Sequence, residues 1–320
     1  MKLNPTEAGT ADDRRLLILS DGKPGHVNQS IAFARHLGWQ YDLLRVAFKR
    51  RVFKGLSYAA DRLGIHAPAL FTADVPAKKY VAVVSAGSDT YYANRTLAEQ
   101  LGCKAVAIML PKGYRLGFDL IVAQQHDDPP RRDTIIRVPI NLTYVEPTGL
   151  VLPQPGHRYV ALVIGGDSAH GKLDAGHLEK QISRVFELFP EHKVWMTTSR
   201  RTPTGVENML RRYRFEQAVY YSQNPVNPIP DYLQHSEYVF LTADSSSMIS
   251  EAVSFGHSCV EVLPLAERWP ENSKFSKLLT ALAEAQCLHV FDGSCAACRT
   301  KISLAEILNS SVTRLVKAEL

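Results

Sequence analysis

Short, unbroken apolar runs alternate with segments of helical period along almost the whole chain, and this alternation constrains the fold most strongly. The runs at residues 16–19, 81–84, 120–123 and 160–164 have the length of strands and contain no polar residue that would indicate a solvent-exposed face of a sheet. Strands buried on both faces of a parallel sheet have this composition. Between such runs, residues 26–37, 91–101 and 178–189 carry apolar side chains three and four positions apart. The pattern predicts βαβ units and parallel sheets.

A segment rich in proline and glycine interrupts this rhythm once, at residues 139–157, which hold four prolines and two glycines. Such composition is typical of a connection between domains, and 320 residues are enough for two of them. We therefore expect an α/β protein with two Rossmann-like, doubly wound domains. The first spans residues 1–145, the second spans 158–300, and a helix within 301–320 packs back on the first. Further strands are expected at 43–46, 105–110, 135–138, 194–197, 219–221, 239–241 and 259–263, and further helices at 56–63, 248–255, 275–285 and 302–316.

Charge and cysteine usage restrict the class of protein. The net charge of +5 is concentrated in residues 1–150, which hold 20 basic and 14 acidic side chains. A basic field of this size suits an acidic substrate, anionic lipid or nucleic acid, or it serves only solubility. The five cysteines are an odd number and no secretory signal precedes them, so we expect a cytoplasmic protein with reduced, unliganded thiols.

The loop after the first expected strand is the first candidate site. Gly22 and Gly25 allow a tight turn whose backbone a ligand can approach, Lys23 adds a cation, and His26 and Asn28 begin the next helix. A histidine at that position can act as a general base near neutral pH. The loop matches neither the phosphate loop of nucleotide hydrolases nor the dinucleotide fingerprint. The alternative interpretation is a simple turn in which His26 caps the helix.

Three further loops follow strands, where ligands of parallel sheets bind. Gly87 and Asp89 lie in a turn of small residues that suits either ligand contact or helix capping. His126 follows the strand at 120–123, beside two carboxylates, so a metal is conceivable there, although the pattern does not define a metal site. Gly165 and Gly166 open the second domain and would let backbone N–H groups approach a phosphate or a sugar.

The loop after residue 241 is the most specific signal. Ser245, Ser246 and Ser247 precede Met248 at a helix start, and serines are poor residues inside a helix. Backbone N–H groups and hydroxyls at a helix N-terminus bind anions such as a diphosphate. Glu251, one to two turns further, could accept hydrogen bonds from the hydroxyls of a ribose. Another post-strand loop supplies guanidinium groups suited to phosphate oxygens; it comprises Ser199, Arg200, Arg201 and Thr202.

These motifs resemble those of a known family. The Gly-x-x-Gly-His loop at 22–26 is similar to the first loop of the peptidoglycan N-acetylglucosaminyltransferase that makes lipid II, a GT-B enzyme. More closely, several motifs in the same order resemble the elongated-mitochondria (mitochondrial fission) family, whose bacterial members are regarded as GT-B glycosyltransferases. The resemblance covers roughly residues 14–295. Its motifs are Ser-Asp-Gly-Lys-Pro-Gly-His at 20–26, Gln-His-Asp at 125–127, Ile-Gly-Gly at 164–166, Ser-Arg-Arg-Thr-Pro at 199–203 and Thr-Ala-Asp-Ser-Ser-Ser-Met-Ile-Ser-Glu-Ala at 242–252. Where the family motif reads Ser-x-Arg, this sequence reads Ser199-Arg200-Arg201. Either Arg200 or Arg201 is therefore the candidate phosphate ligand.

The resemblance implies two domains facing across a cleft and transfer of a sugar from a nucleotide-sugar donor, without a metal or other cofactor. The acceptor would be a cell-surface glycan such as a lipopolysaccharide core, or a lipid-linked molecule. His26 would be the base, with Asp21 or Asp89 as the substitute. Plant members of the family recruit fission machinery to the mitochondrial surface, so a non-catalytic scaffold is the alternative.

The basic first half also contains a candidate membrane contact. Residues 48–54 begin with Phe48, end with Lys54, and mix aromatic and cationic side chains. This composition suits an anionic bilayer, so we expect peripheral binding on the inner face of the cytoplasmic membrane. A solvated basic face explains the cluster alone slightly better. No nucleic-acid-binding module is recognisable, and nucleic acid is not an expected partner.

Overall fold

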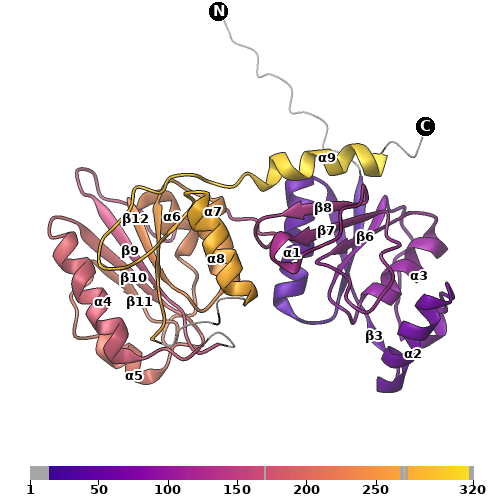
Figure 1. Ribbon diagram of the computed structural model, residues 1–320, viewed down its shortest axis with the longest axis horizontal. Coiled ribbons are helices and arrows are strands. Elements are labelled where there is room, and N and C mark those ends of the chain that lie inside the picture. The colour runs from indigo at the N-terminus through magenta and orange to yellow at the C-terminus, as the bar shows by residue number, and fades with distance from the viewer. Residues whose placement is uncertain (1–13, 169–170, 267–269, 271–272, 317–320) are drawn as a thin grey trace, which may run out of the picture. The chain divides into compact units, whose positions relative to one another are not determined.

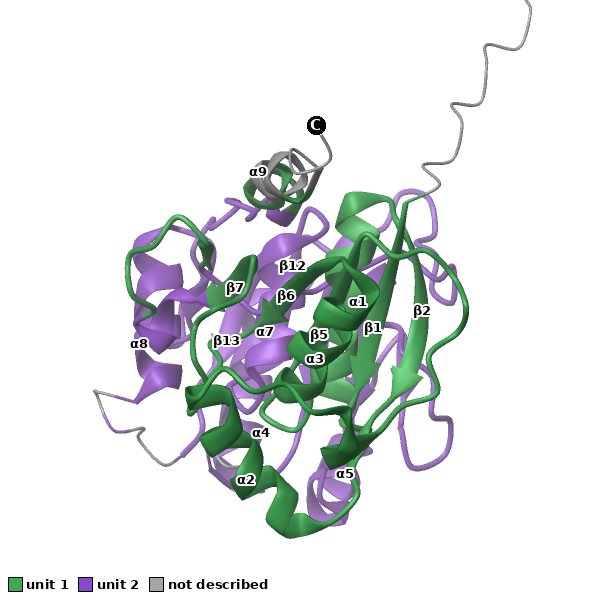
Figure 2. Cartoon of the chain, turned by 90° about the vertical axis from the view of Figure 1, so that its right-hand side faces the viewer, with its two compact units in different colours: residues 1–123, 129–138, 305–320 green, residues 124–128, 139–304 purple. Residues whose placement is uncertain are grey.

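The computed structural model describes residues 14–168, 171–266, 270 and 273–316. The first 13 residues of the expected N-terminal domain lie outside the described part. The chain divides into two compact units, shown in different colours in Figure 2. Unit 1 comprises the described residues within 1–123, 129–138 and 305–320, and unit 2 those within 124–128 and 139–304. Each unit is built around its own six-stranded sheet (Figure 1).

The sheet of unit 1 has the strand order β2-β1-β5-β6-β7-β8. Strands β1, β2, β5, β6 and β7 pair in parallel, with Ile18 of β1 opposite Val84 of β5. The central strands are largely apolar because helices cover both faces of the sheet, as the unbroken runs predict. The strands are β1 Arg15–Ser20, β2 Gln40–Arg45, β5 Ala82–Ala86, β6 Lys104–Ile108, β7 Leu120–Gln124 and β8 Ile135–Val138.

Two helices, α1 (Pro24–Leu37) and α3 (Tyr91–Leu101), pack on this sheet. Pro24 starts α1, where its missing N–H costs no hydrogen bond. Helix α2 (Arg51–Arg62) packs against α3 and a small antiparallel pair, β3 (Ala47–Phe48) and β4 (Phe71–Thr72), at the periphery of the unit (Figure 1). The short 3-10 helices are η1 (Pro68–Leu70) and η2 (Gln125–Asp127). Helix α9 (Leu304–Val316) belongs to unit 1 from residue 305 onwards.

The sheet of unit 2 has the order β11-β10-β9-β12-β13-β14, and every neighbouring pair is parallel. Residues of β9 are fully buried, again as an unbroken apolar run predicts. The strands are β9 Tyr159–Ile164, β10 Lys193–Thr198, β11 Gln217–Val219, β12 Tyr238–Thr242, β13 Cys259–Leu263 and β14 His289–Val290. The helices are α4 Ala175–Leu188, α5 Thr204–Leu210, α6 Ile229–His235, α7 Ser246–Ser254 and α8 Lys274–Glu284.

A buried carboxylate fastens the Pro-rich segment to unit 2. Asp231, in the first turn of α6, accepts hydrogen bonds from the backbone N–H groups of Thr148, Gly149 and Val151 and from the Thr148 hydroxyl. Burial raises the pKa of Asp231, but these hydrogen bonds outweigh burial, so the pKa lies below its ordinary value. Such a carboxylate stays ionised and holds the segment in one conformation.

All five cysteines lie in the described part, and none forms a disulfide. Among the helices that the structure describes, none is both long and apolar enough to span a bilayer.

Candidate functional site

The strand orders place the candidate residues at one position in each sheet. In unit 1 the order reverses between β1 and β5, and in unit 2 it reverses between β9 and β12. At such a switch point the loops leave in opposite directions and open a crevice beyond the carboxyl ends of the strands, where α/β proteins bind ligands. The loops after β1 and β5 contain His26 and Asp89, and the loops after β9 and β12 contain Gly166 and Ser245. Each unit therefore has its own candidate site.

In unit 1, the His26 imidazole is held by a carboxylate. Nδ1 of His26 lies 2.8 Å from Oδ2 of Asp21, whose side chain is almost fully buried, while the His26 side chain stays partly exposed. An ionised carboxylate only accepts hydrogen bonds, so Nδ1 is the donor and Nε2 carries the lone pair. Within the described part of the chain, Nε2 has no hydrogen-bond partner. The pair therefore presents an oriented base towards solvent.

The second carboxylate of this site is neutralised by two lysines. Asp89 accepts hydrogen bonds from Lys23 at 2.9 Å and from Lys54 at 2.5 Å. Partial burial raises the pKa of Asp89, but the hydrogen bonds from Lys54 and Lys23 outweigh it and the pKa is lowered overall. An acid with a lowered pKa is a weak base, so these contacts favour His26 over Asp89 for proton removal. Lys54 joins the site without any signal in the local sequence, because it comes from α2.

Gly87 makes room for the imidazole. Its φ is +90°, and a Cβ atom built on it would lie 2.4 Å from Nδ1 and Cε1 of His26. A side chain at this position would be strained and would also displace the ring. Gly22 has a φ of +84° in the turn before α1. Gly25 lies in the first turn of α1 beside open space, and Asn28 is exposed on the same helix.

In unit 2, a buried carboxylate organises the loops after β9 and β12. Asp244 is inaccessible to solvent and accepts hydrogen bonds from the Gly166 N–H at 3.1 Å and from the Thr242 hydroxyl at 2.7 Å. A Cβ atom on Gly165 would clash with this carboxylate, and one on Gly166 would lie 2.0 Å from the Arg201 carbonyl oxygen. Burial raises the pKa of Asp244 above its usual range. The sequence alone gives Asp244 no role, although it stands in the quoted motif at 242–252.

Asp244 also fixes one of the two candidate arginines. Its Oδ2 accepts a hydrogen bond at 2.9 Å from Nη2 of Arg201, while Nη1 of Arg201 donates to the Asp167 carbonyl at 3.1 Å. The Arg201 side chain remains 39% exposed, so this guanidinium is a fixed cation at the rim. Arg200 is exposed and makes no hydrogen bond within the described residues. Two hydroxyls, those of Ser199 and Thr202, bond to each other and secure the loop to β9.

The start of α7 has the expected hydroxyl-rich form. Ser245 is the N-cap and accepts from the Met248 N–H, and the Ser247 side chain is exposed. Asn141, a residue that the sequence did not single out, donates from Nδ2 to the Ser246 hydroxyl at 3.1 Å and from its backbone N–H to the Ser250 hydroxyl at 3.2 Å. The helix start is thereby fixed while backbone N–H groups and hydroxyls remain at its end.

Glu251 lies one turn and a half into α7, and its carboxylate is half-buried. No described residue makes a hydrogen bond with this carboxylate. Burial raises the pKa of Glu251 to about 7, because the charged form has lost water without gaining a partner. A half-buried acceptor without a partner costs folding free energy and suits a ligand that supplies hydroxyl donors.

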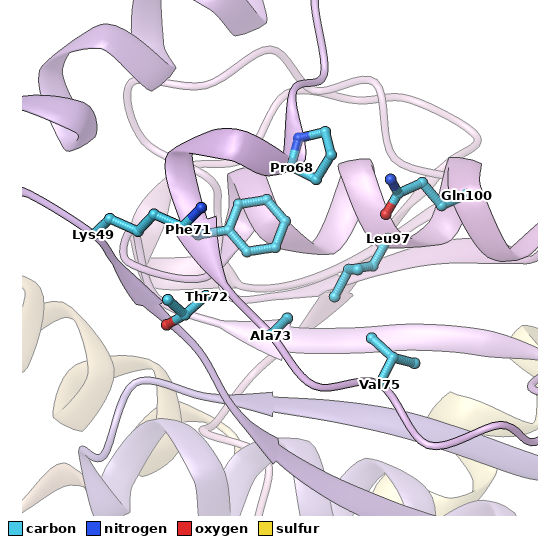
Figure 3. Close-up of a pocket in the computed structure, with 8 residues that line it drawn as sticks. All are labelled: Lys49, Pro68, Phe71, Thr72, Ala73, Val75, Leu97 and Gln100. Carbon is cyan, nitrogen blue, oxygen red and sulfur yellow. The ribbon is translucent and has the colours of Figure 1, made fainter.

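Two features lie apart from these sites. His126 lies in η2, which falls in unit 2 rather than with the other expected acceptor residues. Within the described residues, no group of three His, Cys, Asp or Glu side chains could hold a metal ion. A pocket of about 450 Å³ in unit 1 contains no predicted site residue (Figure 3). It is lined by Lys49, Pro68, Phe71, Thr72, Ala73, Val75, Leu97 and Gln100.

Comparison with known proteins gives one sequence match and several similar folds. The family described as Mitochondrial fission ELM1 matches residues 24–315, and no curated protein matches. The glycotransferase of kitacinnamycin superposes with a TM-score of 0.51 at 12% identity, covering 97% of this chain and 92% of that chain. Arabidopsis thaliana UGT89C1 complexed with UDP-L-rhamnose gives 0.50 at 11% identity, covering 97% and 94%. At such identities the likeness shows the fold alone, and it confirms the predicted GT-B type.

Proposed function

The chain belongs to the Mitochondrial fission ELM1 family, and on that premise we propose that it transfers a sugar from a nucleotide-sugar donor to a hydroxyl acceptor. The observation that carries the proposal is Glu251, a half-buried carboxylate that has no partner among the described residues and that follows a hydroxyl-rich helix start. A nucleoside diphosphate carries ribose hydroxyls, which can donate hydrogen bonds to Glu251, and an anionic diphosphate, which suits the start of the helix.

Unit 2 binds the donor in this proposal. The diphosphate meets the N–H groups of α7 and the hydroxyls of Ser245, Ser246 and Ser247, and the ribose hydroxyls donate to Glu251. Arg201 or Arg200 stabilises the negative charge that grows on the diphosphate as its bond to the sugar breaks. Fixed donors and cations of this kind lower the barrier because they need no reorganisation during the reaction.

Unit 1 binds the acceptor and supplies the base. Nε2 of His26 accepts the proton of the acceptor hydroxyl as its oxygen bonds to the sugar, and Asp21 stabilises the resulting imidazolium. Lys23 and Lys54, which pair with Asp89, are the cations available to an acceptor with an acidic group, such as a lipopolysaccharide core or a lipid-linked sugar. The protein acts in the cytoplasm at the inner face of the membrane in this proposal, and no metal takes part.

Nucleotide binding tests the donor site. A thermal-shift screen across nucleoside diphosphates selects the base, beginning with UDP because UGT89C1 is complexed with a UDP-sugar. Calorimetry then compares the wild type with Glu251→Ala, which we expect to weaken binding at least about tenfold through loss of the hydrogen bonds to a charged acceptor. The matched control is Glu284→Ala, which changes an exposed glutamate of α8. Equal affinity in all three proteins would refute the ribose assignment.

A non-catalytic scaffold at a membrane surface is the second candidate, because unit 1 exposes the large apolar side chains Val52, Leu56 and Leu63 in and just after α2. A scaffold needs neither the oriented base nor the unpartnered carboxylate. The two functions separate cleanly in the same screen, since a scaffold predicts no stabilisation by any nucleoside diphosphate or nucleotide sugar. Stabilisation by one base over the others supports the transferase.

A further inference from the structure

The inward side of helix α2 carries buried polar residues beside aromatic ones. Ser57 and Asp61 are inaccessible to solvent, and Phe53 and Tyr58 pack against the core of the unit. On the outer side, Val52, Leu56 and Leu63 are 71%, 50% and 75% exposed. A surface helix ordinarily exposes polar residues on its outer side, so this row of apolar side chains in water calls for an explanation.

The buried polar side is fully engaged, so the helix cannot simply rotate. The Ser57 hydroxyl lies 2.8 Å from the Tyr114 hydroxyl. Asp61 pairs with Arg95 and accepts the backbone N–H of Arg115 at 2.7 Å. Rotation of α2 would leave these groups buried without partners, which costs more than the exposed apolar area would gain. The outward apolar side is thus fixed by the fold.

The exposed apolar residues form one continuous line. Val52, Leu56, Ala59 and Leu63 are spaced by four, three and four positions, which places them on the same side of a helix. We refer to these four residues as the α2 stripe. Figure 1 shows α2 at the periphery of unit 1, with α3 on its inner side.

The surroundings of the α2 stripe are strongly basic. Residues 45–67 contain six Lys or Arg side chains, of which Lys54 pairs with Asp89, and one acidic residue, the buried and paired Asp61. Lys49, Arg50 and Arg51 are exposed just before or at the helix start, and Arg62 is exposed at its end. Phe48 and Phe53, the aromatic residues of the expected membrane contact at 48–54, are partly buried and pack against the core of the unit.

We propose that the α2 stripe, with its basic surroundings, docks unit 1 on an anionic lipid bilayer. An apolar helix face flanked by cations lies in the interface between headgroups and acyl chains, with the cations at the level of the phosphates. Charge complementarity selects an anionic bilayer over a neutral one. The inference stands apart from the proposed reaction, since α2 docks whether or not the protein transfers a sugar. The pocket of Figure 3 shares Lys49 with the basic region, but no residue of the α2 stripe lines it.

Flotation of the full chain with phosphatidylcholine vesicles, with and without phosphatidylglycerol, tests docking. We expect binding only to the anionic vesicles and release at high salt. The double variant Leu56→Ser with Leu63→Ser should lower the partition coefficient about tenfold or more through lost apolar burial. The matched control is Leu150→Ser with Leu152→Ser, because these leucines of unit 2 are exposed to a similar degree, 50% and 70%.

A charge-reversal pair completes the test. Arg50→Glu with Arg51→Glu should lower the partition coefficient at least about fivefold, whereas the equally exposed Arg131→Glu with Arg132→Glu should leave it unchanged. Circular dichroism confirms that each variant is folded. No vesicle binding by the wild type, or equal losses in the two leucine variants, overturns the proposal. So does a dimer in analytical ultracentrifugation that the α2 stripe variant abolishes, because the stripe would then bind a second copy.

Discussion

Replacing Glu251 by glutamine should stabilise the free protein and weaken its binding of nucleotide at the same time. In the folded chain burial raises the pKa of Glu251 to about 7, while in the unfolded chain the carboxyl returns to its ordinary value of about 4.3. Between these two values the folded state binds more protons than the unfolded state, so stability falls as the pH rises. Above pH 7 the whole penalty is present, and glutamine, which resembles the protonated acid, avoids it.

The size of the effect follows from the pKa difference. At about 1.4 kcal/mol per pKa unit, the shift corresponds to at most about 4 kcal/mol. For a unit of roughly 170 residues, that amount raises the melting temperature by roughly 8–16 °C. Because the two units need not unfold together, only the transition that belongs to unit 2 should move.

Scanning calorimetry from pH 4.5 to pH 8.5 makes the measurement, with Glu284→Gln as the control. We expect the Glu251→Gln melting curve to coincide with the wild type at the acid end and to lie above it beyond pH 7. Titration with the nucleoside diphosphate selected by the screen should show about tenfold weaker binding at pH 8. Parallel pH profiles for the two proteins would refute the assigned burial penalty, and a gain in stability without loss of affinity would refute the ribose contact.

Three other substitutions test the remaining geometry. His26→Ala should lower the rate of transfer about 10²–10⁴-fold with donor affinity unchanged; a normal initial rate removes His26 from the chemistry. Gly87→Ala should lower the rate of transfer about 10²-fold by displacing the imidazole. The control is Gly102→Ala, which is also at positive φ but beside open space and should lower only the stability. Equal rates of transfer in the two variants would contradict the steric argument. In urea unfolding, Gly166→Ala should destabilise unit 2 by about 1–3 kcal/mol, because its Cβ atom clashes with a backbone carbonyl. The control is Gly205→Ala at a helical glycine with open space around it, which should not destabilise unit 2.

The sequence predicts the central strands well because strands that are buried on both faces consist mostly of apolar residues. The runs at 16–19 and 160–164 fall inside β1 and β9. Edge strands and short helices carry weaker signals. The expected strand at 219–221 overlaps only the end of β11 (Gln217–Val219), and the seven-residue helices α5 and α6 have too few turns to show a period.

Helix α2 shows how buried polar residues weaken an apolar pattern. Apolar spacing placed this helix at 56–63, but it begins at Arg51, and two of the residues that hold it to the unit, Ser57 and Asp61, are polar. The candidate sites also contain both residues that the sequence places together and contacts that only the fold brings about. Asp21 and His26 are near each other in the chain, so the sequence placed both in one candidate site, but as alternative bases rather than as a hydrogen-bonded pair. Contacts such as Gly87 with His26, or Asp244 with Arg201, join distant segments and require the fold.

The two hydrogen bonds from Asn141 connect the start of α7 to the chain segment that enters unit 2. Asn141 lies three residues after β8, where the chain enters unit 2. Because the Ser246 oxygen accepts from Asn141, its hydroxyl hydrogen is left to point at an incoming phosphate. Hydrogen bonds in such a chain polarise and strengthen one another, and coupling of this kind acts equally in both directions. A bound diphosphate should therefore tighten the hold on the entering chain, seen as slower amide hydrogen exchange at residues 139–142.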